Sequence, residues 1–252
     1  FGKNLWHESR IPLFEQSIET GGYGGAIHGP LKRVSFGSGY ARETIMECFQ
    51  ENLEHFPVLL PELINTPIKQ LEHLRLHNGT VWRWNRPIVG FDTDGTPHIR
   101  IEHRTPSAGP TLIDTVSNAA FYYGLSKNLA DEISTQGVPI AFAQAKDNFY
   151  QAARFGLEST VVWFDGKKHN LQKLIQNELL PRAYQGLHSL NIDPDDIKNY
   201  LGVIEQRIAT KQTGSQWQRN FMQQDNVDLV ELTKAYLQQQ VSEIPVGEWS
   251  MN

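Results

Sequence analysis

The sequence predicts an α+β fold, in which a partial antiparallel sheet is followed by a mostly helical C-terminal region. Residues 74–104 combine β-branched and aromatic side chains with turn residues, whereas residues 111–134 and most of the chain after residue 137 are helical by pattern. Strands that precede a block of helices favour an α+β fold over alternating βαβ units. We therefore expect a sheet-containing part, residues 1–136, and a helical part, residues 137–252, packed as one domain.

The first 57 residues predict loops and one helix. Glycine clusters at 21–25 and 35–39 are typical of loops, and the first does not match a phosphate-binding GxxxxGK[ST] loop. The spacing of apolar side chains predicts a helix over 41–55, which Pro57 ends. Backbone amides at 37–39 could bind an anion at the start of this helix, although an ordinary turn is the simpler interpretation.

Two strands and a long helix follow. Residues 81–84 and 98–104 predict an antiparallel pair, and Asp92–Gly95 supplies turn chemistry between them. Pro110 suits the first turn of a helix over 111–134. We expect the buried stripe of that helix to consist of Leu112, Val116, Ala119, Ala120, Tyr123 and Leu129. Breaks are predicted near 156–168, 191–194 and 214, with a helix start at Asp193.

Net charge, cysteine content and the length of apolar runs limit the class of protein. A net charge of −5 and a pI near 6.0 give no reason to expect a nucleic-acid partner. The lone Cys48 excludes an internal disulfide framework and favours a reducing compartment, where we expect it to be a small core side chain. No apolar run approaches the ~20 residues of a membrane span, and no signal peptide is evident. These features predict a cytoplasmic protein without a membrane partner.

The second strand carries the charged side chains that are most informative about function. Arg100, Glu102 and Arg104 are two residues apart and therefore share one face of a strand, while Ile99 and Ile101 are expected to point into a core. Pairing with the preceding strand would bring further arginines to the same carboxylate. We single out Arg83 and Arg86, with Asn85 between them.

Such a group of arginines suits phosphate, because the planar guanidinium matches phosphate oxygens. Glu102 could hold a divalent cation that bridges the phosphates, but one glutamate is an incomplete magnesium site. The alternative is a solvated sheet face with cross-strand ion pairs, each worth ~0–1 kcal/mol. His73, His77, His98 and His103 lack the i,i+4 spacing of a helical zinc pair, and we interpret them as structural.

A family resemblance is carried by Leu74–Pro87 (LRLHNGTVWRWNRP), by IRIEHR at 99–104 and by AGPT at 108–111. These segments resemble the glutamate-cysteine ligase-like family of carboxylate-amine ligases, in the glutamine synthetase superfamily. Weaker similarity runs from LWHESRIPLFEQ at 5–16 to PVGEW at 245–249. The resemblance implies that the sheet belongs to a glutamine-synthetase-like catalytic domain, in which ATP phosphorylates the γ-carboxylate of glutamate and an amine attacks the acyl phosphate.

The resemblance also implies roles for individual residues. The Glu-x-Arg of the superfamily corresponds to Glu102, a metal ligand, and Arg104, a catalytic arginine that contacts phosphate. Arg83 and Arg86 resemble arginines of the neighbouring strand that contact the nucleotide or the transferred phosphate. Arg10 and, on the same strand as Glu102, Arg100 are candidates for binding substrate. ATP and Mg²⁺, or Mn²⁺ in its place, are the implied cofactors.

Family members carry a further N-terminal half whose glutamates complete the metal sites, and this chain begins at Phe1 in the middle of the family pattern. We therefore expect the missing N-terminal half to be its partner, the chain alone to be inactive, and its exposed strand edges to permit a homo-oligomer. Glutamate and cysteine are the expected substrates. A related ligase with another amine, and a noncatalytic helical interaction module, stay open as alternatives.

Overall fold

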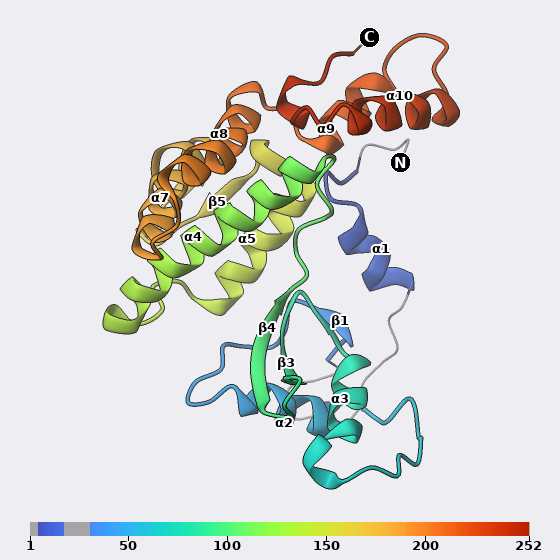
Figure 1. Cartoon of the computed structure of the whole chain (residues 1–252), viewed down its shortest axis with the longest axis vertical. Coiled ribbons are helices and arrows are strands. Elements are labelled where there is room, and N and C mark those ends of the chain that lie inside the picture. The colour runs from blue at the N-terminus through green and yellow to red at the C-terminus, as the bar shows by residue number, and fades with distance from the viewer. Residues whose placement is uncertain (1–4, 18–30, 252) are drawn as a thin grey trace. The chain divides into compact units, whose positions relative to one another are not determined.

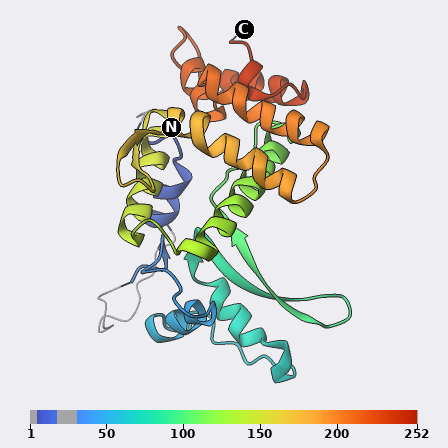
Figure 2. The same cartoon turned by 90° about the vertical axis from the view of Figure 1, so that its left-hand side faces the viewer.

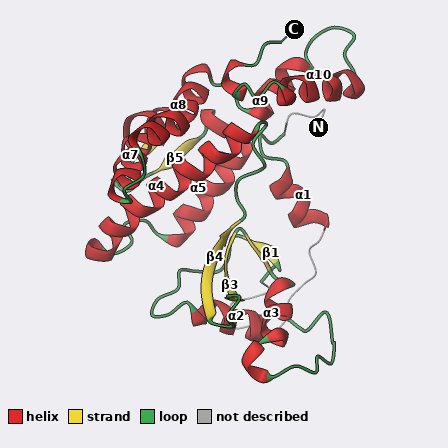
Figure 3. Cartoon of the chain, viewed as in Figure 1, coloured by secondary structure: helices red, strands yellow, loops and turns green. Residues whose placement is uncertain are grey.

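The computed structural model describes residues 5–17 and 31–251. The protein has the predicted α+β fold, with small sheets and many helices (Figures 1 and 3). The glycine cluster at 21–25, predicted as a loop, lies outside the described residues. The chain divides into a hairpin unit, Arg10–Ser107, and a helical unit, Phe1–Ser9 with Ala108–Asn252. This division follows Ser107, whereas the sequence placed it after residue 136, so the long helix after Thr111 belongs with the later helices.

The hairpin unit contains short helices around a two-stranded antiparallel ribbon (Figure 1). Its elements are α1 (Arg10–Ser17), β1 (Val34–Ser35), α2 (Met46–His55), η1 (Ile68–Gln70), α3 (Glu72–Gly79), β2 (Trp82–Arg83), β3 (Asn85–Phe91) and β4 (Pro97–His103).

The antiparallel ribbon of β3 and β4 confirms the predicted second strand and the turn at Asp92–Gly95. The register runs from Asn85 opposite His103 to Phe91 opposite Pro97. The backbone N–H of Gly95 donates to the carbonyl of Asp92 at 2.9 Å, and Gly95 has a φ of +84°, which glycine adopts without steric cost.

The first strand of the ribbon is not where the sequence placed it. Residues 82–83 form only β2, which pairs in parallel with β1, while the partner of β4 begins at Asn85. Residues 74–79, which the sequence pattern assigns to the β region, belong to helix α3. Its helical turns end at Asn78 and Gly79, residues of low helix propensity, before the β-rich run begins.

The expected core contact of the second strand is wrong. Ile99 and Ile101 are 48% and 49% exposed in the described structure. On the opposite face of β4, Arg100 lines a cavity together with Arg75 and Asn78 of α3, and Glu102 is half-buried. Alternation along the strand was therefore predicted correctly, but the face that is covered was not.

The helical unit follows Ser107 (Figure 1). Its helices are α4 (Leu112–Gln136), α5 (Phe142–Phe155), α6 (Leu171–Leu174), α7 (Leu180–Ser189), α8 (Pro194–Thr210), α9 (Gly214–Phe221) and α10 (Leu229–Val241), with short turns η2 (Gly156–Glu158), η3 (Ile175–Leu179) and η4 (Val246–Glu248). The predicted break at 156–168 contains most of a small antiparallel pair, β5 (Thr160–Val162) and β6 (Lys168–Asn170). Asp193 caps α8 as predicted, accepting from Asp195 N at 2.8 Å.

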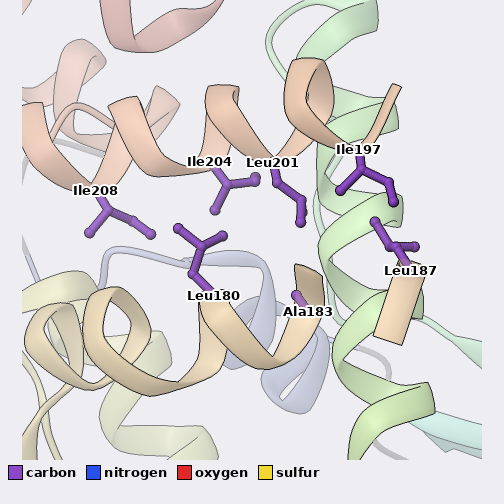
Figure 4. Packing of buried hydrophobic residues seen from close by; sticks show 7 residues of the cluster. All are labelled: Leu180, Ala183, Leu187, Ile197, Leu201, Ile204 and Ile208. Carbon is purple, nitrogen blue, oxygen red and sulfur yellow. The ribbon is translucent and has the colours of Figure 1, made fainter. Parts of the chain in front are cut away.

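The main apolar core of this unit lies between α7 and α8 (Figure 4). Its buried side chains are Leu180, Ala183, Leu187, Ile197, Leu201, Ile204 and Ile208. Helix α4 lies beside both helices (Figure 2), and Ala120, Phe121 and Leu125 pack against the cluster. Burial of this apolar surface is the main contribution to the stability of the unit. Among the described residues, no helix combines the length and apolar character of a membrane span.

The predicted buried stripe of α4 needs correction. Leu112 and Tyr123 are exposed, and the buried residues of the helix are Asp114, Ser117 and Gly124. A side chain at Gly124 would collide with the carbonyl oxygen of Ala183 on α7. Close backbone approach, rather than large apolar side chains, therefore sets this helix contact, and an apolar pattern cannot reveal it.

Candidate functional site

The carboxylate of Glu102 joins two arginines on one face of the hairpin. Arg86 stands directly opposite Glu102 in the strand register, and its Nε donates to Glu102 Oε2 at 2.7 Å. Arg104, two residues further along, donates its Nε to the same oxygen. We call these three residues the Glu102 cluster. The cluster realises the predicted cross-strand grouping, although Arg86, rather than Arg83, is the arginine that the hairpin brings to the carboxylate.

The arginines keep the Glu102 carboxylate charged. Partial burial by itself would raise the pKa of Glu102, but the hydrogen bonds from Arg104 and Arg86 outweigh it and hold the pKa below its usual value. Glu102 Oε1 makes no hydrogen bond or ion pair within the described chain. One oxygen of an ionised carboxylate is therefore open to an external ligand.

Arg86 is held by the end of helix α3. Its Nη1 donates to the carbonyls of Asn78 at 2.9 Å, Val81 at 3.1 Å and Gly79 at 3.3 Å, which lie at or just beyond the last helical turn. Carbonyls there lack helical partners and carry partial negative charge, so a cation stabilises them. Burial lowers the pKa of the Arg86 guanidinium, although the hydrogen bond that Arg86 donates to Glu102 raises it, and the arginine stays protonated at neutral pH.

Arg104 and Arg10 lie against tryptophan rings. The guanidinium carbon of Arg104 is 3.8 Å from the centroid of the Trp82 ring, and that of Arg10 is 5.8 Å from the Trp84 ring. Arg10 Nη2 also donates to the carbonyls of Arg104 at 3.0 Å and Thr105 at 2.6 Å. Arg10 thus fixes the backbone beside the Glu102 cluster.

The other two arginines predicted for the site lie elsewhere in the hairpin unit. Arg83 Nη1 donates to the carbonyls of Lys32 and Arg33, both at 3.0 Å, and its Nη2 is 3.3 Å from Glu51 Oε1. Arg100 lies further along β4 and contacts His98 instead of Glu102. The strand pairing therefore separates the six predicted residues into the Glu102 cluster with Arg10, the buried Arg83, and Arg100.

A metal site is not complete in the described residues. No group of three or more His, Cys, Asp or Glu side chains in the parts of the chain that the structure describes could hold a metal ion. Glu102 can offer one oxygen, whereas Mg²⁺ requires an octahedral set of oxygen ligands. Glu102 alone does not fit the ion, and we derive no chemical step through a metal.

Helix α2 begins at Met46 rather than at residue 41, and the backbone amides that bind a carboxylate ahead of it are those of 42–44, not the amides of 37–39 that the sequence singled out. The Glu47 carboxylate accepts from the backbone N–H groups of Glu43 at 2.7 Å, Thr44 at 2.9 Å and Arg42 at 3.0 Å, ahead of α2. These bonds lower the pKa of Glu47 to about 2. The amides just ahead of α2 are thus bonded by the chain's own carboxylate, and anion binding at 37–39 stays a prediction.

The sequence pattern did not identify Arg75 as a candidate site residue. Arg75 projects from α3 toward a cavity of about 310 Å³ that Arg86 and Arg100 also line. The helical spacing of Arg75, Asn78 and Gly79 would have placed them on one face, but only if residues 72–79 had been recognised as a helix.

Comparison of the sequence with models of known protein families finds no matching family, and comparison with curated proteins finds no similar protein.

Proposed function

We propose that this chain is the C-terminal segment of an ATP-dependent carboxylate-amine ligase that forms an amide through γ-glutamyl phosphate. Glutamate is the carboxylate substrate and cysteine the first candidate for the amine, as the resemblance to glutamate-cysteine ligases implies. The observation that carries the proposal is the Glu102 cluster, where two guanidinium groups flank one ionised carboxylate on the same sheet face.

The proposed reaction has two steps. The γ-phosphoryl group of ATP passes to an oxygen of the glutamate γ-carboxylate, which gives an acyl phosphate and ADP. The amine nitrogen then attacks the acyl carbon, phosphate leaves, and the nitrogen loses a proton as the amide forms. Negative charge on the transferring phosphoryl group is what fixed arginines stabilise, and such groups act best when the fold holds them in place.

The contacts of each residue suggest its part in this reaction. Arg86 is fixed through Nε and Nη1, while its Nη2 makes no hydrogen bond within the described chain and can contact phosphate. Arg104, fixed over Trp82, is the second phosphate ligand. Arg10 acts as a positioning residue through the carbonyls of Arg104 and Thr105. Arg83, tied to Glu51 and two carbonyls, supports the fold in this proposal.

Glu102 orients both arginines and leaves Oε1 for a cation. The remaining ligands of Mg²⁺ or Mn²⁺ would come from a preceding half of the protein, which the resemblance implies. This chain alone should therefore bind Mg-ATP weakly and release no ADP, and a cytoplasmic location fits the chemistry because ATP is supplied there.

The test is release of ADP that depends on both glutamate and an amine, measured with the full-length reading frame that encodes this chain. Glu102→Gln removes the charge that orients Arg86 and Arg104, and we expect kcat to fall by about 10²–10³, the loss typical of a removed electrostatic group. Glu54→Gln, an exposed carboxylate on α2, is the matched control and should retain the wild-type rate. Unchanged ADP release in Glu102→Gln would remove the Glu102 cluster from the mechanism.

The alternative function is a noncatalytic interaction module formed by the helices. Exposed apolar side chains on α10 favour it, namely Leu229, Val230, Leu237 and Val241. A full-length protein that releases no ADP with any amine tested, but binds a partner through α10, would support this alternative. Light scattering on the chain by itself measures whether it forms the homo-oligomer that exposed edges permit.

A further inference from the structure

The hairpin unit contains a cavity of about 310 Å³ between α3 and the charged face of β3 and β4. Its polar lining consists of Arg75, Arg86, Arg100 and Asn78, and no acidic side chain lines it. The volume lies at the lower end of the range of about 300–1,000 Å³ that small-molecule sites occupy. Concave walls that carry charge of one sign concentrate counter-ions. The lining therefore favours an anion.

Arg75 enters the cavity from α3 without an acidic partner. Its guanidinium carbon lies 5.7 Å from the centroid of the Phe91 ring on β3, and the side chain makes no ion pair or hydrogen bond within the described chain. The ring gives the guanidinium a fixed surface to lie on, but it does not neutralise the charge. The hydrogen-bond donors of Arg75 are accordingly available to a ligand.

Arg100 reaches the cavity from β4 and is oriented by a neighbouring histidine. The distance between Arg100 Nη1 and His98 Nε2 is 2.7 Å, and His98 Nδ1 lies 3.2 Å from Asp92 Oδ1. Because an arginine can only donate, Nε2 accepts and the imidazole proton lies on Nδ1, toward Asp92. Asp92 is thus separated from the arginine by the ring and does not line the cavity.

Gly90 makes room for this arrangement. It stands opposite His98 in the strand register, and a Cβ atom at this position would collide with Arg100 Nη1 and His98 Nε2. Since both colliding atoms are at the ends of side chains, an alanine here would displace the two side chains and leave the strand backbone intact. Residue 90 therefore controls where the Arg100 guanidinium lies.

Arg86 provides a buried cation in the cavity wall. Its Nε and Nη1 are bonded to Glu102 and to three carbonyls, and Nη2 makes no hydrogen bond within the described chain. Asn78, by contrast, bonds Asn52 and the carbonyl of Pro87 through its side chain and serves as a rigid wall. The cavity thus combines one buried and two exposed guanidinium groups.

We propose that this cavity binds a phosphate group of a small molecule, with Arg75 and Arg100 as its ligands from opposite walls and Arg86 as the buried cation. Guanidinium groups present paired donors to phosphate oxygens, and several of them suit a group that carries more than one negative charge. The inference goes beyond the proposed ligase reaction, because phosphate binding here requires neither acyl transfer nor a metal. The phosphate can be inorganic or the terminal phosphate of a nucleotide.

The test is isothermal titration of the 252-residue chain with inorganic phosphate and, in a second arm, with ADP without divalent metal. We expect saturable binding by at least one of them. Arg75→Gln should weaken it by about 10-fold or more, because a charge-assisted hydrogen bond is lost. Arg100→Gln and Gly90→Ala should each weaken it in the same direction, Gly90→Ala by displacing Arg100.

Lys69→Gln is the matched control, because it removes the same charge from an exposed position of the hairpin unit outside the cavity. It should leave affinity within about 2-fold of the wild type. ADP binding at least 10-fold tighter than phosphate identifies a nucleotide phosphate, while comparable affinities identify a free phosphate.

Two results would overturn the proposal. One is no binding of either anion at about 10 mM, weaker than a useful small-molecule site. The other is equal weakening in Lys69→Gln and Arg75→Gln, which would indicate diffuse attraction. The two proposals share Arg86, but the ligase is judged separately, by ADP release in Glu102→Gln.

Discussion

The two units of this chain build their interiors from different chemistry. The helical unit is held by apolar clusters, of which the one between α7 and α8 contains fully buried Ala183 and Leu201 (Figure 4). The hairpin unit buries three arginines among its aromatic and aliphatic side chains: Arg33, Arg83 and Arg86. Apolar contacts are non-directional, whereas each buried guanidinium requires carbonyl or carboxylate partners at defined positions.

This difference in buried residues indicates that a ligand-binding site is to be sought in the hairpin unit. In the hairpin unit, buried arginines donate to carbonyls at the end of α3 and in loops, such as those of Asn78 and Pro57. Arg86 alone of these is fixed at Nε and Nη1 while its Nη2 makes no hydrogen bond within the described chain. The helical unit has a buried ion pair too, between Arg207 and Asp114 at 2.6 Å, but Asp114 is also bonded by the backbone of Val246 and Thr111 and serves the helix cap.

The largest effect should come from the apolar core. Leu201→Ala deletes a fully buried side chain of α8 and should lower the free energy of unfolding by about 2–5 kcal/mol. Urea unfolding measures the loss, and hydrogen exchange locates it in the helical unit. Leu237→Ala on exposed α10 is the control, with an expected change within about 0.5 kcal/mol. A similar loss for both variants would contradict the assignment of the core.

A smaller effect is expected from a buried arginine of the hairpin unit. Arg86→Met keeps much of the apolar stem but removes the side-chain donor to the carbonyls of Asn78, Gly79 and Val81, and it should cost about 1–3 kcal/mol. Hydrogen exchange should rise at the end of α3 and in β3. Arg75→Met, at an exposed position without a hydrogen bond, should change stability by no more than about 0.5 kcal/mol. If Arg86→Met proves equally neutral, the arginine does not hold the fold of this unit.

The smallest expected effect is a local dependence of the start of α2 on pH. Because the backbone N–H bonds lower the pKa of Glu47 to about 2, its carboxylate stabilises the start of α2 above the usual glutamate value of 4.5 and loses that contribution as the pH falls toward 2. Carboxyl NMR shifts should titrate in this window, while the protection of the amides of 42–44, relative to their intrinsic exchange rates at each pH, decreases. In Glu47→Gln the protection of these amides, corrected for intrinsic exchange, should no longer change between pH 5 and 2. A Glu47 carboxyl that titrates near 4.5 would contradict the capping role.

The sequence by itself determined the α+β order, the hairpin turn at Asp92–Gly95, the start of α8 at Asp193 and the presence of Arg86, Glu102 and Arg104 near one another. These follow from local signals: turn residues, caps, and the two-residue period of a strand. Periodicity also placed Arg100 on the correct face, but it could not say which atoms would surround each side chain.

Only the tertiary structure decided which arginine meets which partner. Strand register set Arg86 opposite Glu102, the end of α3 supplied carbonyls to Arg86, and the same helix brought Arg75 to the cavity. The tertiary structure likewise leaves Ile99 exposed and makes Gly124 a buried residue, because the burial of a residue depends on which element packs against it. Local pattern specifies the face on which a side chain stands, and non-local contacts specify whether that face is covered, by what and with which charge.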